Sequence, residues 1–193
     1  MAVTLITAEM LDNLQESLVL RRATAAQLRQ RAETEYSWAS DADAYELAPG
    51  LARSYVLSVA ADDFLSAGDG ERALAVAREA ADAAEPGSWD GVVSVVRAHL
   101  GLGAVDAAKA AADEARHAAA SDPAVAEMMG DAFELADELG LAERWYTIGL
   151  RGLDVVESRF WRERLLRDRH RVRRDQGKPL DGFDEEFEAL STP

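Results

Sequence analysis

The stretch that decides the fold runs from Asp122 to Leu153 and reads DPAVAEMMGDAFELADELGLAERWYTIGLRGL. Asp122 followed by Pro123 is typical of a helix start, because Asp caps free backbone amides and Pro suits the first helical turn. Gly140 marks a break, after which a second helical pattern continues to Leu153. Since the connection is short, we expect two helices packed antiparallel as a hairpin.

This hairpin has small residues where two helices can cross and bulky residues where gaps need filling. Gly and Ala at a crossing let two backbones approach closely, and larger side chains fill the space between neighbouring hairpins. Related breaks occur upstream, since Gly68 and Gly103 lie 35 residues apart and Gly140 follows 37 residues later. A period near 34 residues is typical of stacked helical hairpins. The recurring positions are Ala61, Phe64, Gly68, Ala73, Ala77 and Ala80 in the first unit; Gly103, Ala108, Ala112 and Ala115 in the second; and Gly130, Phe133, Leu139, Ala142, Tyr146 and Gly149 in the third.

At these positions the chain resembles the tetratricopeptide repeat (TPR) family. In that family the first helix of each hairpin carries a small residue and, three positions later, an aromatic one. The third unit follows this pattern best, whereas Val96 and His99 take the first-helix positions of the second unit, and the consensus Tyr and Pro are missing. The resemblance covers residues 52–153. It implies an α-solenoid whose concave groove, formed by the first helices, binds a segment of another protein.

Start and stop signals extend the helical pattern along the chain. Thr24 with Gln27 matches a capping box, and Gly177 ends a long C-terminal helix. Other predicted starts are Pro49, Ser88 and Asp154 (with Glu157), and a further helix is predicted over 104–120; residues 39–48 stay unassigned, and 92–96 is a strand-like run. The predicted fold class is all-α, an α-solenoid with helical caps at both ends. Its predicted parts are capping helices (1–48), three TPR-like hairpins (49–153), an Arg-rich capping helix (154–177) and an acidic amphipathic tail (178–193).

Composition excludes several classes of protein. The 193 residues are 48% hydrophobic, which is enough for a core, and their net charge of -15 disfavours general binding to nucleic acid. The absence of Cys excludes disulfides, thiolate metal sites and a Cys nucleophile. The N-terminal stretch lacks a basic region before its short apolar run, and no run suits a membrane span, so we expect a cytoplasmic protein. The Ala-rich composition, with Lys109 and Lys178 the only Lys among 21 basic residues, is typical of a GC-rich bacterial source.

No motif predicts an enzyme, a metal or a cofactor. Asp113 and His117 lie one helical turn apart, but a surface ion pair explains them better than a metal site. Residues 68–73 fit a dinucleotide-binding fingerprint formally, yet that fingerprint needs a preceding strand and the preceding segment is predicted to be helical. Residues 41–45 begin like a calcium loop but lack its third oxygen ligand and its Gly. We therefore expect a non-enzymatic protein with neither cofactor nor metal.

Charge is distributed unevenly along the chain. Residues 1–158 carry a net charge of -16, residues 159–174 carry +6 and residues 175–193 carry -5, which sum to -15. The basic segment has three interpretations: a capping helix kept polar by Arg, a docking surface for an acidic protein, RNA or phosphates, or a partner for acids of the same chain. In the tail, Phe183, Phe187 and Leu190 share one helical face among acidic residues, which predicts that the tail can fold back onto the Arg helix. An equal alternative is that the tail is an acidic amphipathic peptide offered to another protein. The basic patch comprises Arg159, Arg162, Arg164, Arg167, Arg169, Arg171, Arg173 and Arg174.

Function is expected to reside in the groove of the hairpins. Its first helices are mostly acidic, which indicates binding of a basic or amphipathic peptide. Nucleic acid is an unlikely partner and a membrane is not expected, while a homo-oligomer is possible. Two alternatives stay open: a regulatory protein whose Arg helix binds nucleic acid or an acidic partner, and a self-assembling structural protein. The predicted groove residues are Tyr55, Ser58, Asp62, Arg97, Glu127, Asp131 and Glu134.

Overall fold

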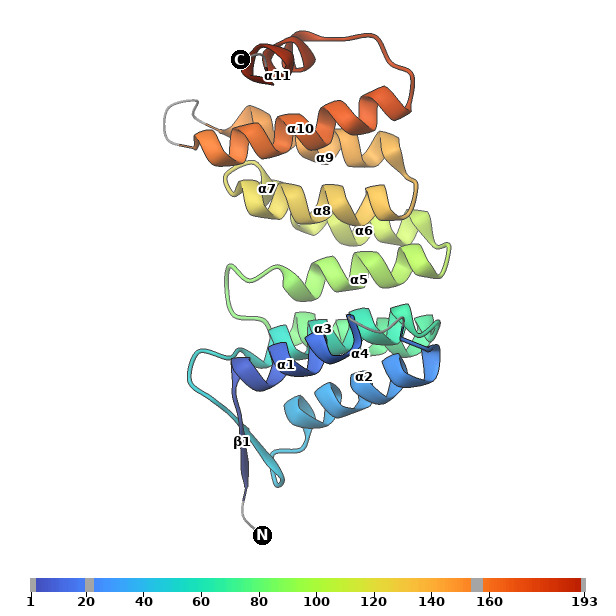
Figure 1. Ribbon diagram of the computed structural model, residues 1–193, viewed down its shortest axis with the longest axis vertical. Helices are drawn as coiled ribbons and strands as arrows, with labels where there is room; N and C mark the ends of the chain where they lie inside the picture. Colours follow the sequence, from blue (N-terminus) through green and yellow to red (C-terminus); the bar gives the residue numbers. More distant parts are fainter. Residues whose placement is uncertain (1–2, 20–22, 154–157, 192–193) are drawn as a thin grey trace. The chain divides into compact units, whose positions relative to one another are not determined.

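The computed structural model describes the backbone of residues 3–19, 23–153 and 158–191 (Figure 1). It is mostly helical, as predicted, and it divides within α6 into an N-terminal unit (Met1–Lys109) and a C-terminal unit (Ala110–Pro193). The N-terminal unit holds β1 (Thr4–Ile6), α1 (Ala8–Val19), α2 (Ala25–Ser40), β2 (Tyr45–Leu47), α3 (Arg53–Ser66), α4 (Gly70–Asp82), α5 (Asp90–Gly101) and the first part of α6 (Val105–Glu114). The C-terminal unit continues with α7 (Arg116–Ala119), α8 (Pro123–Leu135), α9 (Leu139–Gly152), α10 (Arg159–Asp175) and α11 (Gly182–Ser191).

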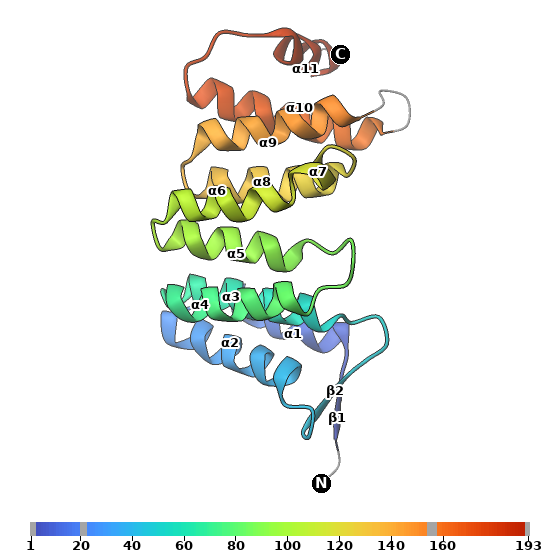
Figure 2. The ribbon, with the colours of Figure 1, turned by 180° about the vertical axis from the view of Figure 1, so that it is seen from behind.

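Helices that follow one another in the N-terminal unit pack side by side. Each of α2, α3 and α4 contacts the next helix, and α3 also contacts α5 (Figure 2). Leu57, Phe64 and Val76 are fully buried in the core between them. At Gly91 an added Cβ would collide with the backbone of Ala81, so α5 approaches α4 more closely than any residue with a side chain allows.

The C-terminal unit is built in the same way. The α8 helix packs against α9, α10 packs against both, and α11 packs against α10. Gly130 leaves room for the ring of Tyr146, which is fully buried. Phe133, Leu150 and Leu165 complete this core. No helix of the described residues is both long and apolar enough to cross a bilayer.

Four helix ends among the described residues share one backbone motif. Gly68, Gly103 and Asp137 all have positive φ, and the amide that follows each donates to a carbonyl five residues back, at 2.9 Å in all three cases. At the end of α10, Gly177 has positive φ and the amide of Lys178 donates to the carbonyl of Arg173 at 3.1 Å. This is the Schellman pattern, which satisfies carbonyls left free at a helix end. The first three positions are 35 and 34 residues apart. The predicted third break at Gly140 was misplaced, because Asp137 takes the left-handed position and Gly140 lies inside α9.

Most predicted helix starts are confirmed, with exceptions. The capping box at Thr24 and the cap of Asp122, with Pro123 at the start of α8, are present. Ser88 was a wrong assignment, since α5 begins after Trp89 without a side-chain cap. The single helix predicted over 104–120 is divided, because α6 ends at Glu114 and α7 is a separate turn. Asp154 and Glu157 lie outside the described residues.

Two short strands were missed. The strands β1 and β2 are parallel, with Thr4 opposite Tyr45 and Ile6 opposite Leu47. Strand β2 lies within the segment 39–48, which the sequence leaves unassigned. The extended backbone continues beyond β2, where the amide of Ala48 donates to the carbonyl of Ile6 at 2.8 Å. This pairing explains why Pro49 does not start a helix and α3 begins only at Arg53. The strand-like run 92–96 is helical, within α5.

Candidate functional site

The Arg-rich helix α10 is the centre of the candidate site. Residues three or four apart lie on one helical face. Arg164, Asp168 and Arg171 form one such face, and Arg162, Arg169 and Arg173 form another. Leu165, Leu166 and Val172 are buried between these faces and anchor α10 in the core.

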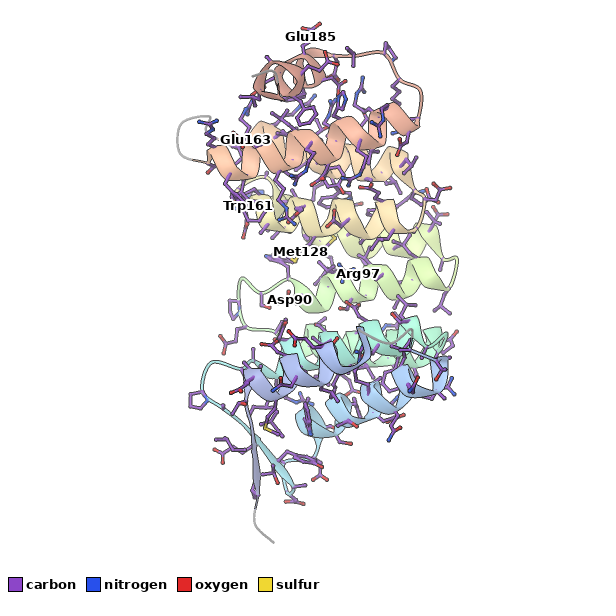
Figure 3. All side chains as sticks on the ribbon, viewed as in Figure 1. Asp90, Arg97, Met128, Trp161, Glu163 and Glu185 are labelled. Carbon is purple, nitrogen blue, oxygen red and sulfur yellow. The ribbon has the colours of Figure 1, made fainter. Side chains whose placement is uncertain are left out.

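On the first face, Arg side chains of α10 neutralise acids of α8. Arg171 Nε and one of its terminal nitrogens donate to the two oxygens of Glu134, each at 2.8 Å, and Arg164 Nε donates to Glu127. The other terminal nitrogen of Arg171 donates to Asp168 at 2.8 Å. Two of the acids predicted for the groove are therefore paired within the molecule. Side chains on these helices are drawn in Figure 3.

Tyr146 of α9 supports the same acids from inside the fold. Its hydroxyl lies 2.7 Å from Asp131 Oδ1 and 2.8 Å from Glu134 Oε2. Burial, together with these two carboxylates, raises the pKa of Tyr146, so the phenol keeps its proton and acts as a donor. Burial alone would raise the pKa of Glu134, but the hydrogen bonds from Arg171 and Tyr146 outweigh it and hold that pKa below its usual value.

A cavity of about 520 Å³ lies beside this network. Asp131, Glu134, Leu135 and Arg171 line it, so it combines two predicted groove positions with one residue of the predicted basic patch. Leu135 is 82% exposed, more than any other large apolar residue that the structure describes. The site therefore offers an apolar contact, the carboxylate of Asp131 and an internally balanced Glu–Arg pair.

The remaining predicted groove residues behave differently. Tyr55 is half-exposed on α3. Asp62 forms an ion pair with Arg97 at 2.6 Å in the N-terminal unit, and burial raises the pKa of Asp62. Ser58 and Glu127 are buried, and the Ser58 hydroxyl donates to the carbonyl of Ser54 in its own helix at 2.9 Å.

The eight Arg residues do not form one free basic patch. Each has a carboxylate of the same chain within 4 Å. The structure therefore agrees with the interpretation that this segment pairs with acids of the same chain. Only Arg159, Arg167 and Arg174, among the eight, keep more than half of the side chain exposed. The prediction that the tail folds back is also confirmed, because α11 packs on α10.

Sequence reasoning missed a buried charged cluster in the N-terminal unit. Arg31 donates to both oxygens of Asp63, and Gln15 Nε2 donates to Glu35 Oε1 at 2.5 Å. Glu35 is fully buried, and burial and the neighbouring Asp63 raise its pKa to about 8. The contacts join α1, α2 and α3 across separations of 20 to 32 residues, so no local motif marks them.

Two other sequence motifs lie at or within helices. The fingerprint over 68–73 follows helix α3 rather than a strand, and Asp113 lies 3.7 Å from Arg116. Among the described residues, no group of three or more His, Asp or Glu side chains is placed to hold a metal ion. No family model, curated protein or solved structure matches the chain.

Proposed function

We propose that this protein is a non-enzymatic protein–protein interaction module that binds a basic or amphipathic peptide of another protein. The observation that carries the proposal is the cavity of about 520 Å³ with Leu135 at its rim. A Leu side chain that is 82% exposed gains stability when an apolar ligand group covers it. Such a residue within a polar rim is typical of an interaction site.

The charges beside Leu135 select the ligand. Arg171 neutralises Glu134, whereas Asp131 accepts from the neutral Tyr146 hydroxyl and interacts with Arg164 only at longer range. Because no ion pair within 4 Å engages Asp131 among the described residues, its carboxylate can contact a cationic group of a ligand. A peptide with one apolar side chain and a Lys or Arg close to it satisfies both Leu135 and Asp131.

We also infer that the helical pairs form a TPR-like α-solenoid. The supporting observation is the recurrence of one helix-end motif at Gly68, Gly103 and Asp137, with spacings close to the 34 residues of that repeat. Binding on the first helix of a hairpin, here α8, is what the resemblance implies. The internal ion pairs of α10 reduce the support for nucleic acid as the partner.

The test is selection of peptides from a random display library against the full chain. We expect enriched peptides to combine an apolar residue with Lys or Arg, and to lose at least tenfold in affinity on Leu135→Ser. Asp131→Asn should weaken binding by about 3-fold or more, as expected for loss of one charge-assisted contact. Leu102→Ser, at another exposed Leu, is the matched control. Peptides that bind Leu135→Ser as well as the unaltered chain would contradict the proposal.

A further inference from the structure

The tail helix α11 is seated on α10 through three paired carboxylates (Figure 1). Asp181 accepts from two nitrogens of Arg169 at 2.9 and 2.6 Å, and Glu186 accepts from two nitrogens of Arg162 at 2.5 and 2.7 Å. Paired donors of this kind fix the orientation of a carboxylate as well as its position.

Further contacts complete this arrangement. Asp184 accepts from Arg173 Nε at 2.8 Å and lies 3.3 Å from His170 Nδ1. The Arg169 guanidinium lies 5.1 Å from the centre of the Phe183 ring, and the His170 ring lies 5.0 Å from that of Phe187. The face of α10 formed by Arg162, Arg169, His170 and Arg173, here named the tail face, therefore recognises acids and aromatic rings together.

The tail does not fill this face. A cavity of about 400 Å³, lined by residues of α10 and α11 and of their connection, remains beside the two helices. Leu180 and Leu190 are about half-exposed. In addition, α11 has only ten residues, and a helix of that length is marginal in water without a surface to pack on. The seated helix therefore leaves a cavity beside it and part of its apolar surface uncovered.

We propose that the tail face is a docking surface for an acidic amphipathic helix of another protein, and that α11 occupies it as an internal competitor. The tail itself shows which ligand pattern the tail face binds. In the segment that starts at Asp181, the acids that contact α10 are at positions 1, 4 and 6, and the Phe residues are at positions 3 and 7. A tethered segment acts at an effective concentration of about 1 mM. A partner must therefore make contacts that α11 lacks, and the cavity of about 400 Å³ offers the space for them. This inference is independent of the proposed peptide site at Leu135, because it concerns the other face of α10 and a ligand of opposite charge.

The test measures binding of a fluorescent synthetic peptide of residues 179–191 to the full chain by anisotropy at low salt. In a tail-neutral variant, Asp181→Asn, Asp184→Asn and Glu186→Gln release the tail while leaving the tail face unchanged. We expect this variant to bind the peptide at least tenfold more tightly than the unaltered chain. Its matched control, with the same change of charge at exposed acids, carries Asp106→Asn, Glu114→Gln and Glu185→Gln and should bind like the unaltered chain; Figure 3 shows Glu185 on the side of α11 away from α10.

Two further measurements complete the test. Adding Arg162→Gln and Arg173→Gln to the tail-neutral variant should abolish the gain, with helicity checked by circular dichroism. If that variant does not fold, a peptide with Phe183→Ala and Phe187→Ala serves instead and should bind at least tenfold more weakly. Equal affinity of the tail-neutral variant and the unaltered chain would overturn the proposal. Self-association of the tail-neutral variant without peptide binding would also overturn it, because the face would then serve contacts between copies.

Discussion

Replacing Glu35 by Gln should change how the stability of this protein depends on pH. Glu35 is fully buried in the N-terminal unit, and its Oε2 has no hydrogen-bond partner among the described residues. Burial, and the negative charge of the neighbouring Asp63, raise its pKa to about 8 from an ordinary 4.5. Gln has the same shape and cannot ionise, and its amide provides a permanent donor near Asp63.

The sign and size of the effect follow from linkage. Because the folded state binds this proton more tightly than the unfolded chain, the resulting stabilisation is complete below pH 4.5 and is lost as the pH rises through about 8. A one-unit difference in pKa is about 1.4 kcal/mol, so the unaltered protein should lose about 2–3 kcal/mol between pH 5 and 7 and about 4 kcal/mol between pH 5 and 9. Glu35→Gln should lack this loss.

Urea denaturation at pH 5, 7 and 9, followed by far-ultraviolet circular dichroism, measures the difference. We expect the two proteins to have similar unfolding free energies at pH 5 and Glu35→Gln to be the more stable at pH 9. Glu33→Gln, at an exposed position of the same helix, is the matched control and should follow the unaltered protein. Parallel curves for Glu35→Gln and the unaltered protein across this range would refute the reasoning, since they would mean that Glu35 is ionised when buried.

Four other substitutions test the packing and the caps, each by its urea midpoint. Gly130→Ala should destabilise by about 1–3 kcal/mol because its Cβ would overlap the ring of Tyr146. Gly140→Ala in α9, whose Cβ would meet Gln176 Oε1 at an ordinary contact distance of 4.0 Å, should stabilise by about 0.5–1 kcal/mol; similar effects at both sites would contradict this. Tyr146→Phe should cost about 1–2 kcal/mol through the lost hydroxyl donor, and an unchanged midpoint would show that the bond contributes nothing. Thr24→Ala should cost about 1 kcal/mol by removing the capping box, and a loss within error of zero would exclude that role.

Part of the candidate site could be predicted from the sequence, because the residue pattern that indicates it lies within one short segment. The helical face shared by Phe183 and Phe187, beside a run of acids, predicted that the tail folds back onto α10, and the structure bears this out. Opposite charges in neighbouring segments attract whatever their detailed geometry. The partner of each Arg was not predictable, because Arg171 pairs with Glu134, which precedes it by 37 residues.

The sequence by itself determined the helices and many of their ends, since caps such as Thr24 and Asp122 act on amides two or three residues away. Only the tertiary structure decided the parallel pairing of β1 with β2, because a parallel ladder joins segments whose individual propensities are weak. It likewise decided that Ser58 is buried and that Arg31 meets Asp63. Burial and ion pairing depend on which faces of distant helices pack together. The residues next to a position in the sequence do not determine this.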